Sequence, residues 1–231
     1  MRKQVIIVAG GSGLRMGTDI PKQFLLLDGK PVLMHTIEAF YNYDPDIFII
    51  LVLPEKHQSY WKTLCETYHF RIAHQIVFGG NTRFHSVKNG LKLVTDYSLV
   101  AVHDGARALV TEDVIKRTFD AAASSKMACP VIPVTDSLRR TMRIGSRSVS
   151  RESYCLVQTP QIFVSKILLK AYEQDYLDEF TDDVSVVSAL RSSQTVLVEG
   201  SPENIKITTP LDLAIAETII KLRIKSFKVK D

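Results

Sequence analysis

The stretch QVIIVAGGSGLRMGTDIPKQF (Gln4–Phe24) joins a short apolar run to a loop that contains four glycines. The run Gln4–Val8 is rich in β-branched residues and predicts a buried strand. The glycines follow it, then Arg15, then the pair Pro21–Lys22. Open α/β sheets bind their ligands at the carboxyl ends of their strands. We therefore expect this loop to lie at a ligand site and to place two cations beside it.

Two well-known glycine loops do not match this stretch. The dinucleotide-binding pattern G-x-G-x-x-G, started at Gly11, has Met16 where its third glycine belongs. The P-loop ending Gly-Lys-Ser/Thr is absent from the stretch. What remains is G-G-x-G-x-R-M followed by P-K, in which glycines offer backbone N–H groups to phosphates and Arg15 and Lys22 add positive charge. The structural alternative is a tight turn with two surface cations.

The composition is that of an ordinary globular protein. The chain has 231 residues, 45% of them hydrophobic and 23% charged, and a formal net charge of +4. This length allows one large α/β domain or two small ones. The mild positive charge suits an anionic substrate but is too weak by itself to indicate nucleic-acid binding.

Cysteine usage and hydropathy indicate the compartment. Cys65, Cys129 and Cys155 are odd in number and widely spaced, with no CxxC pair. This pattern disfavours a disulfide framework and a structural zinc site, and it fits a reducing cytosol. Because no apolar run approaches the length of a bilayer span, we expect a cytoplasmic protein with no membrane partner.

Strand-like and helical patterns alternate along most of the chain. The strand-like runs are Gln4–Val8, Ile47–Leu53, His74–Phe78, Leu99–His103, Cys129–Val134 and Thr195–Val198. The helical segments are Val32–Phe40, Ser59–Tyr68, Arg83–Val94, Glu112–Ser124, Lys166–Tyr176 and Asp183–Arg191. Thr209 and Pro210 predict the start of a final helix. Strands that are apolar on both faces and separated by helices predict a Rossmann-like α/β fold, with a mainly parallel sheet and helices on both faces.

One segment, Asp136–Arg151, breaks this alternation. Its residues alternate around Ile144–Gly145–Ser146 and predict a β-hairpin that projects from the body. The segment carries five arginines: Arg139, Arg140, Arg143, Arg147 and Arg151. Most of these are as consistent with a solvated ribbon as with a binding role. With no linker or internal repeat, the prediction is a single domain over 1–231 with a β-arm at about 136–155.

Four motifs resemble those of known enzymes. AGGSGLRM…PKQF resembles the signature of nucleotidyltransferases that join a nucleoside triphosphate to a sugar or polyol phosphate. VHDGARALV (Val102–Val110), LVQTPQIF (Leu156–Phe163) and VEGSPENIKITTPLDLAIAE (Val198–Glu217) resemble segments of one branch, the 2-C-methyl-D-erythritol 4-phosphate cytidylyltransferases. The likeness runs from residue 8 to about residue 217 and is far more specific than the glycine loop alone.

The resemblance implies a nucleotide site. Arg15 and Lys22 take the places of catalytic residues that neutralise phosphate charge, and Asp104 takes that of the aspartate that holds Mg²⁺ on the nucleotide. The positions that correspond to nucleotide-binding residues are Ala9, Gly10, Gly11, Gly13, Gly80, Asn81, Ser86, Asp104 and Gly105. Asn81 departs from the aspartate usual in the family, but its amide oxygen could still accept from the cytosine amino group.

The resemblance also implies a site for the second substrate. Ser137 and Arg151 in the arm, with Arg107, Glu203 and Lys206, correspond to residues that bind the polyol phosphate, and Arg151 and Lys206 are expected to orient its attacking phosphate. Ser137 stands for the usual threonine and Glu203 for an aspartate. In the family the arm crosses to a second subunit, so we expect a homodimer joined through the arm.

The implied reaction transfers CMP from CTP to 2-C-methyl-D-erythritol 4-phosphate, with Mg²⁺, giving 4-diphosphocytidyl-2-C-methyl-D-erythritol and pyrophosphate in non-mevalonate isoprenoid biosynthesis. The nearest alternative is a ribitol-5-phosphate cytidylyltransferase, against which the position of Arg151 and the TDDVSVV segment argue. A non-catalytic RNA-binding protein is a distant alternative, because the arm lacks aromatic residues for base stacking. We therefore expect no nucleic-acid partner, and we expect His103 to support its loop rather than to take part in catalysis.

Overall fold

The computed structural model describes residues 1–11, 20–190 and 194–228. Within these residues the central sheet has eight strands. They are β1 (Arg2–Val8), β4 (Phe48–Leu53), β5 (Gln75–Phe78), β6 (Ser98–Asp104), β7 (Met127–Pro133), β10 (Cys155–Val157), β11 (Gln161–Val164) and β12 (Val196–Glu199). The strand order β10-β7-β11-β6-β1-β4-β5, with β12 along β7, places β1 and β6 side by side in its middle.

The sheet is parallel in its middle and mixed toward one edge. β6, β1, β4 and β5 run parallel, and so do β7 and β12. β11 runs antiparallel to β6 and β7, and β10 antiparallel to β7. In the central register Val8 pairs with Asp104, and the two strands continue into a contact between the Gly105 N–H and the Val8 carbonyl at 2.9 Å. The carboxyl ends of β1 and β6 therefore open at the same place.

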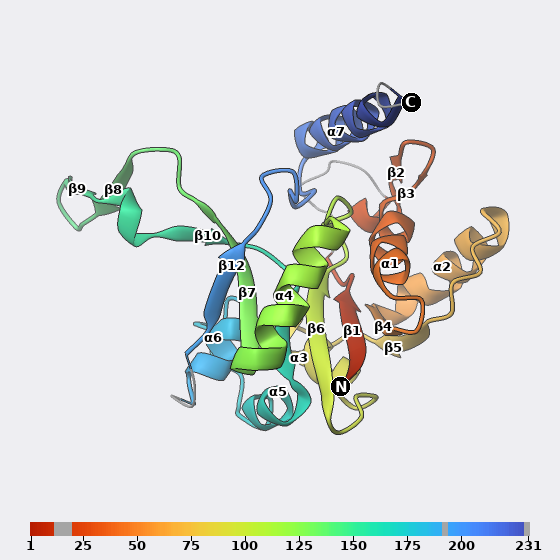
Figure 1. Ribbon diagram of the computed structural model, residues 1–231, viewed down its shortest axis with the longest axis horizontal. Coiled ribbons are helices and arrows are strands. Elements are labelled where there is room, and N and C mark those ends of the chain that lie inside the picture. The colour runs from red at the N-terminus through yellow and green to blue at the C-terminus, as the bar shows by residue number, and fades with distance from the viewer. Residues whose placement is uncertain (12–19, 191–193, 229–231) are drawn as a thin grey trace.

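Helices cover both faces of the sheet (Figure 1). Helices α1 (Val32–Tyr43), α2 (Glu55–Thr67) and α4 (Glu112–Ser125) share one hydrophobic cluster with the sheet, and α3 (Arg83–Leu91), α5 (Ser165–Ala171) and α6 (Asp183–Ser188) share the other. Alternate residues of β1 divide between them: Ile7 packs in the first cluster and Ile6 in the second. This division follows from the two-residue period of a strand and makes both faces of β1 apolar.

The last helix, α7 (Pro210–Lys228), packs on a separate small cluster rather than on the sheet. Its Ala216 lies with Leu27 and Leu109, from the short hairpin β2 (Leu26–Leu27)–β3 (Lys30–Pro31) and the loop after β6. Asp212 accepts hydrogen bonds from the backbone N–H groups of Thr208 and Thr209, which satisfies donors at the start of the helix. None of the helices in the described part of the chain combines the length and apolarity of a membrane span.

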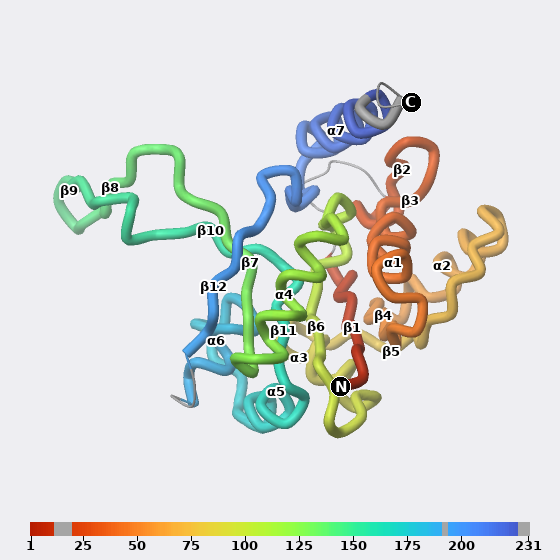
Figure 2. The backbone as a smooth tube through the Cα atoms, in the orientation of Figure 1, coloured from red at the N-terminus to blue at the C-terminus, as the bar shows by residue number. Residues whose placement is uncertain are grey.

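The arm is a two-stranded ribbon that stands apart from the sheet (Figure 2). Strands β8 (Leu138–Thr141) and β9 (Ser146–Val149) pair antiparallel around Gly145, whose φ of +75° lies in the left-handed region. Arg139 donates to Ser146 and Ser148 across the ribbon. The predicted hairpin and its turn are therefore confirmed.

The structure confirms the predicted α/β class and the order of its main elements, with shifted boundaries. The segment predicted as a helix over Lys166–Tyr176 is helical only to Ala171, and the helix predicted over Arg83–Val94 ends at Leu91. Four short strands escaped the sequence analysis: β2, β3, β10 and β11. The last two flank the cis Thr159–Pro160 bond in the QTPQ motif, where turn chemistry masks strands of three and four residues.

Candidate functional site

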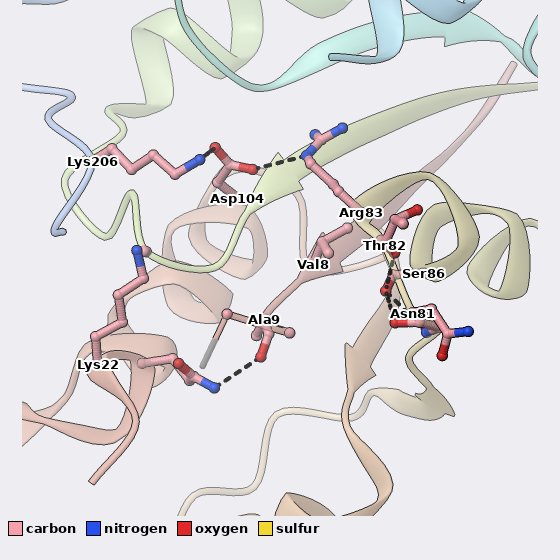
Figure 3. Close-up of a pocket in the computed structure, with 14 residues that line it drawn as sticks. Val8, Ala9, Lys22, Asn81, Thr82, Arg83, Ser86, Asp104 and Lys206 are labelled. Atoms are coloured by element: carbon pink, nitrogen blue, oxygen red, sulfur yellow. Dashed lines mark hydrogen bonds and ion pairs between the residues drawn. The ribbon is translucent and has the colours of Figure 1, made fainter. Parts of the chain in front are cut away.

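A cavity of about 280 Å³ opens at the carboxyl ends of β1 and β6. Three segments distant in sequence surround it: the glycine loop after β1 with the PKQF turn, the loop from β5 into α3, and the end of β6 with Lys206 opposite (Figure 3). Its described lining residues are Val8, Ala9, Gly10, Gly11, Lys22, Gln23, Gly80, Asn81, Thr82, Arg83, Ser86, Asp104, Ala106 and Lys206. The fold thus brings residues from three of the four motifs, and from the loop that carries Asn81 and Ser86, to one cavity.

The loop between β5 and α3 forms one neutral, polar wall of this cavity. The Gly80 N–H donates to Ser86 Oγ at 3.0 Å, and Ser86 Oγ donates to the Thr82 carbonyl at the same distance. Thr82 caps α3 by accepting from the backbone N–H of His85. A Cβ on Gly80 would lie 2.4 Å from the Cβ of His85, so this close approach requires glycine. The wall therefore offers backbone and hydroxyl groups held in place by their own hydrogen bonds.

The PKQF turn positions Lys22 at the opposite wall. Lys22 is the first residue of the one-turn helix η2 (Lys22–Phe24), and the two residues that follow it are anchored to the body. Gln23 Nε2 donates to the Ala9 carbonyl at 2.9 Å, and the buried Phe24 ring packs against Tyr60 and Trp61 of α2. Lys22 is left to extend along the cavity, as Figure 3 shows. Gln23 and Phe24 thus hold the turn that presents Lys22 to the cavity.

Asp104 lies among three cationic side chains at the end of β6. Lys206 Nζ is 2.8 Å from its Oδ2, Arg83 Nε is 3.3 Å from its Oδ1, and Arg107 Nε is 3.7 Å from Oδ2. Burial alone would raise the pKa of Asp104, but the positive charges of Arg83, Lys206 and Arg107 outweigh it and hold that pKa well below its usual range. Asp104 is therefore ionised throughout the neutral range.

His103 holds the loop that carries these groups, as predicted. Its buried ring contacts Thr159 Oγ1 through Nδ1 at 3.0 Å and the Arg107 carbonyl through Nε2 at 3.2 Å. The Asp104 N–H donates to the same Thr159 oxygen at 3.1 Å, so Thr159 donates its proton to Nδ1 and Nε2–H donates to the carbonyl. Burial lowers the pKa of His103 to about 3, which keeps the ring neutral.

A second cavity adjoins the first and shares Arg83, Asp104 and Lys206 with it. Its described lining residues are Arg83, Asp104, Arg107, Val157, Gln158, Thr159, Gln161, Thr181, Asp182 and Lys206. The wall opposite Asp104 thus comes from the QTPQ motif and the start of α6. Two hollows that meet at one carboxylate and two cations could hold two ligands side by side, with their charged groups at the shared boundary.

Most predicted site residues that the structure describes lie in these two cavities. Ala9, Gly10, Gly11, Lys22, Gly80, Asn81, Ser86, Asp104 and Lys206 line the first, and Arg107 lines the second. Gly105 lines neither and lies just behind Asp104, hydrogen-bonded to Val8. Gly13 and Arg15 fall outside the described residues.

Three predicted residues lie away from the cavities of their own chain. Ser137 and Arg151 belong to the arm, where Arg151 donates to the Thr135 carbonyl. Glu203 is 2.7 Å from Arg223 of α7 and lines neither cavity. Their roles toward a substrate stay predictions, and for the two arm residues the prediction already involves a partner subunit.

Sequence reasoning missed Arg83 and the residues behind it. Arg83 lies between Asn81 and Ser86, both assigned to the nucleotide, but it received no role itself. An arginine at the start of a predicted helix, shortly after the glycine pair Gly79–Gly80, was a visible signal. Its partner Asp183 comes from TDDVSVV, which had been noted only as a likeness. The two are 100 residues apart in sequence, so their pairing had no local signal.

Comparison with known proteins gives the family. A family model described as 2-C-methyl-D-erythritol 4-phosphate cytidylyltransferase matches residues 4–222. The chain belongs to this family. Membership confirms the predicted family and the prediction of a nucleotidyltransferase.

Relatives within the cytidylyltransferase family match almost end to end. The 2-C-methyl-D-erythritol 4-phosphate cytidylyltransferase of Phocaeicola vulgatus is 56% identical over 95% of this chain and 100% of its own. That of Bacteroides thetaiotaomicron is 54% identical with the same coverage. The crystal structure of the Thermus thermophilus cytidylyltransferase superposes with a TM-score of 0.77 at 32% identity, covering 96% of this chain and 100% of that one. The synthase from Anaerococcus prevotii gives a TM-score of 0.81 at 27% identity, with 95% and 98% covered.

The donor set tests whether this cytidylyltransferase site suits Mg²⁺. Asp104 is the one carboxylate among the described residues of the first cavity, and no cluster of three or more His, Cys, Asp or Glu side chains able to hold a metal occurs in the described ranges. Mg²⁺ commonly binds one or two carboxylates, substrate phosphates and several waters. The residues therefore fit a magnesium ion shared with a phosphate-bearing ligand rather than one held by protein alone.

Proposed function

We propose that this chain transfers CMP from CTP to 2-C-methyl-D-erythritol 4-phosphate, releasing pyrophosphate. An oxygen of the methylerythritol phosphate attacks the α-phosphorus of CTP, the new P–O bond forms, and the bond to the pyrophosphate oxygen breaks. The attacking group is already an anion, so the reaction needs no covalent enzyme nucleophile. The observation that carries this proposal is the meeting of two cavities at Asp104, Arg83 and Lys206, in a chain of this family.

The first cavity suits CTP. Lys22, Arg83 and Lys206 outnumber the single carboxylate of Asp104 among its described charged residues, so the cavity carries a net positive charge for a triphosphate. Arg15 would add to it from the part of the glycine loop outside the described residues. The neutral wall at Gly80 and Ser86 lies across from Lys22 and suits a base that is read by hydrogen bonds. In this orientation the α-phosphorus lies toward the shared boundary.

Asp104 would hold a magnesium ion on the CTP phosphates. The bound ion would supply Lewis-acid stabilisation of charge on the phosphate oxygens. The low pKa of Asp104 keeps its carboxylate ionised for this purpose. Lys206, whose side chain is 42% exposed, can leave Asp104 more readily than the less exposed Arg107 and can then bind a substrate phosphate.

The second cavity suits the polyol phosphate. Arg107 and Lys206 provide positive charge, and Thr159, Gln158 and Thr181 provide hydrogen-bonding groups for hydroxyls. We further propose that the arm of a second copy covers this cavity, bringing Ser137 and Arg151 to the phosphate. Exposed apolar side chains on Leu156 and Leu197, next to the base of the arm, are available for contact between the copies.

The test measures pyrophosphate release with CTP, Mg²⁺ and either 2-C-methyl-D-erythritol 4-phosphate or ribitol 5-phosphate. We expect release with the first acceptor, dependent on CTP and lost on chelation of divalent cations. Faster release with ribitol 5-phosphate would establish the alternative cytidylyltransferase. Absence of release with both acceptors, together with salt-sensitive RNA binding, would support the non-catalytic reading.

A further inference from the structure

Arg83 lies between two carboxylates, Asp104 at the end of β6 and Asp183 at the start of α6. Its Nη2 donates to Asp183 Oδ2 at 2.7 Å, while its Nε donates to Asp104 Oδ1 at 3.3 Å. Asp104 faces the cavities, whereas the Asp183 side chain has no exposed surface and lines neither of the two. Among the hydrogen bonds of the Asp183 side chain in the described residues, the one to Arg83 is the one that leads to Asp104.

Asp183 is itself fixed from behind. Tyr172 donates its hydroxyl proton to Asp183 Oδ1 at 2.6 Å, so each carboxylate oxygen of Asp183 has its own partner. The Tyr172 ring stacks on Phe84 at 4.7 Å between centroids, and Phe84 follows Arg83 in α3. Burial and the charge of Asp183 raise the pKa of Tyr172 well above its ordinary value, so its hydroxyl keeps the proton that it donates.

The guanidinium group explains why this arrangement matters. It is planar, with its N–H donors in a fixed fork, so holding one edge determines where the others point. With Nη2 on Asp183, the Nε–H is directed at a single oxygen of Asp104. Figure 3 draws the contact between Arg83 and Asp104. Without that anchor the guanidinium could turn its fork onto both oxygens of Asp104, the geometry that arginine and carboxylate prefer.

We propose that Asp183 is a positioning residue for CMP transfer: with Tyr172 it holds Arg83 so that Arg83 contacts Asp104 through Oδ1 alone. Oδ2, which Lys206 Nζ holds at 2.8 Å, then becomes accessible to a ligand when Lys206 turns to a substrate phosphate. This inference rests on the proposed function. A buried ion pair is seldom a net source of stability compared with apolar packing. A role in orienting Asp104 therefore accounts for the buried Asp183 better than a contribution to stability does.

The test is a double-mutant cycle. Asp183→Asn keeps the shape and removes the charge, and we expect it to lower kcat/KM for CTP about 10–100-fold and to weaken CTP binding in the presence of Mg²⁺, measured by calorimetry. Tyr172→Phe, which keeps the stacking on Phe84, should cause a smaller loss in the same direction. Arg83→Lys should not substitute for arginine, because an ammonium group has no planar fork. Asp120→Asn, on the exposed surface of α4, is the control for loss of a carboxylate and should leave both measurements unchanged.

Asp183→Asn in an Arg83→Gln background separates a positioning role of Asp183 from a purely structural one. If Asp183 acts through Arg83, adding Asp183→Asn to Arg83→Gln changes kcat/KM and the CTP dissociation constant less than about threefold. An equal loss in both backgrounds, or single-variant values within about twofold of the parent protein, would overturn the inference. The parent protein's pyrophosphate release tests the proposed function separately, and the calorimetric cycle stands even where that release fails.

Discussion

At the scale of single residues, the site is governed by an excess of positive charge around one carboxylate. Asp104 has Lys206, Arg83 and Arg107 within 3.7 Å, and Lys22 lines the same cavity from the opposite wall. Like charges brought together in this way repel one another, and Asp104, with Asp183 behind Arg83, offsets only part of that repulsion. An anionic ligand offsets the rest. The arrangement therefore favours binding of a phosphate chain over the ligand-free state.

Replacement of Lys22 tests this charge balance directly. We expect Lys22→Ala to lower kcat about 10²–10³-fold, as loss of one preorganised group that stabilises transition-state charge does. Arg15→Ala should behave alike. The measurement is steady-state pyrophosphate release, with Lys116→Ala on the exposed face of α4 as the control cation. Turnover within a few-fold of the parent protein in both Lys22→Ala and Arg15→Ala would contradict the assignment.

His103 makes stability depend on pH. Its pKa is lowered from 6.5 to about 3 by burial, so between these values the unfolded chain binds a proton that the folded chain does not. Stability due to the neutral ring is fully present above about pH 6.5 and is lost at up to about 1.4 kcal/mol per pH unit as pH falls toward 3. We expect His103→Gln to flatten the pH dependence of the unfolding free energy between pH 6.5 and 4.5. Denaturant titrations across that range measure it, and parallel curves for the two proteins would refute the linkage.

At the scale of elements, short pieces without regular structure are positioned by longer elements behind them. The PKQF turn has a single helical turn of its own, yet Phe24 anchors it on α2 and Gln23 ties it to the glycine loop. The QTPQ motif is likewise held by Thr159 on one side and by Gln158, which donates to the Ser201 carbonyl, on the other. The PKQF turn, which carries Lys22, and the QTPQ motif, which lines the second cavity, thus have backbones held by buried side chains.

Loss of the Phe24 anchor should affect both stability and binding. We expect Phe24→Ala to reduce the unfolding free energy by about 3–5 kcal/mol, because it leaves a cavity against α2. It should also raise KM for CTP, since Lys22 directly precedes the anchored pair. Leu26→Ala, at a half-exposed neighbouring position, is the matched control and should change both much less. Thermal or denaturant unfolding and steady-state kinetics supply the two readouts, and a normal KM in a destabilised Phe24→Ala would separate the anchor from the site.

At the scale of the whole molecule, the arm lies far from the cavities that its residues are proposed to serve. Arg151 is exposed and donates to the Thr135 carbonyl at the base of the arm, while Asp104 ends β6 in the central sheet. Figure 1 shows β8 and β9 well apart from β6. A ribbon that projects without packing on its own sheet buries little surface of its own. A second copy that receives it would explain both its position and the exposed apolar residues at its base.

Complementation between two inactive variants tests this arrangement. Lys22→Ala removes a cation from the first cavity, and Arg151→Ala removes the arginine that the arm is proposed to bring to the substrate. If the arm serves a partner, a dimer with one copy of each contains one site with an intact cavity and an intact arm. We therefore expect mixed and re-equilibrated variants to recover up to about one half of the parent activity per mixed dimer, as one of the two sites of such a dimer is intact. If sedimentation shows that the dimers mix but no activity is recovered, Arg151 acts in the site of its own chain.

Much of the fold could be predicted because its signals are local. The buried strands of the parallel part are continuous apolar runs, and the α4 helix is capped by Thr111 and contains an apolar stripe. The predictions were weakest for short strands beside a turn, as in β10 and β11 on either side of Thr159–Pro160. Three or four residues are too few to show the alternation that identifies a strand. The end of α5 was also missed, because the apolar pattern continues past Ala171 while the helix does not.

By itself the sequence determined the α/β class, the family, the glycine loop and the identity of most residues in the cavities, because these depend on local periodicity and on motifs that stay contiguous in the chain. Only the tertiary structure decided that Asp104 meets Lys206 and Arg83, and that Asp183 and Tyr172 hold Arg83 from behind. These contacts join residues from 11 to 102 positions apart in the sequence, as the bonds of Tyr172 and Lys206 show. The physical reason is that parallel strands bring their carboxyl ends together regardless of how much chain separates them, so charge coupling at that edge follows from packing and not from spacing.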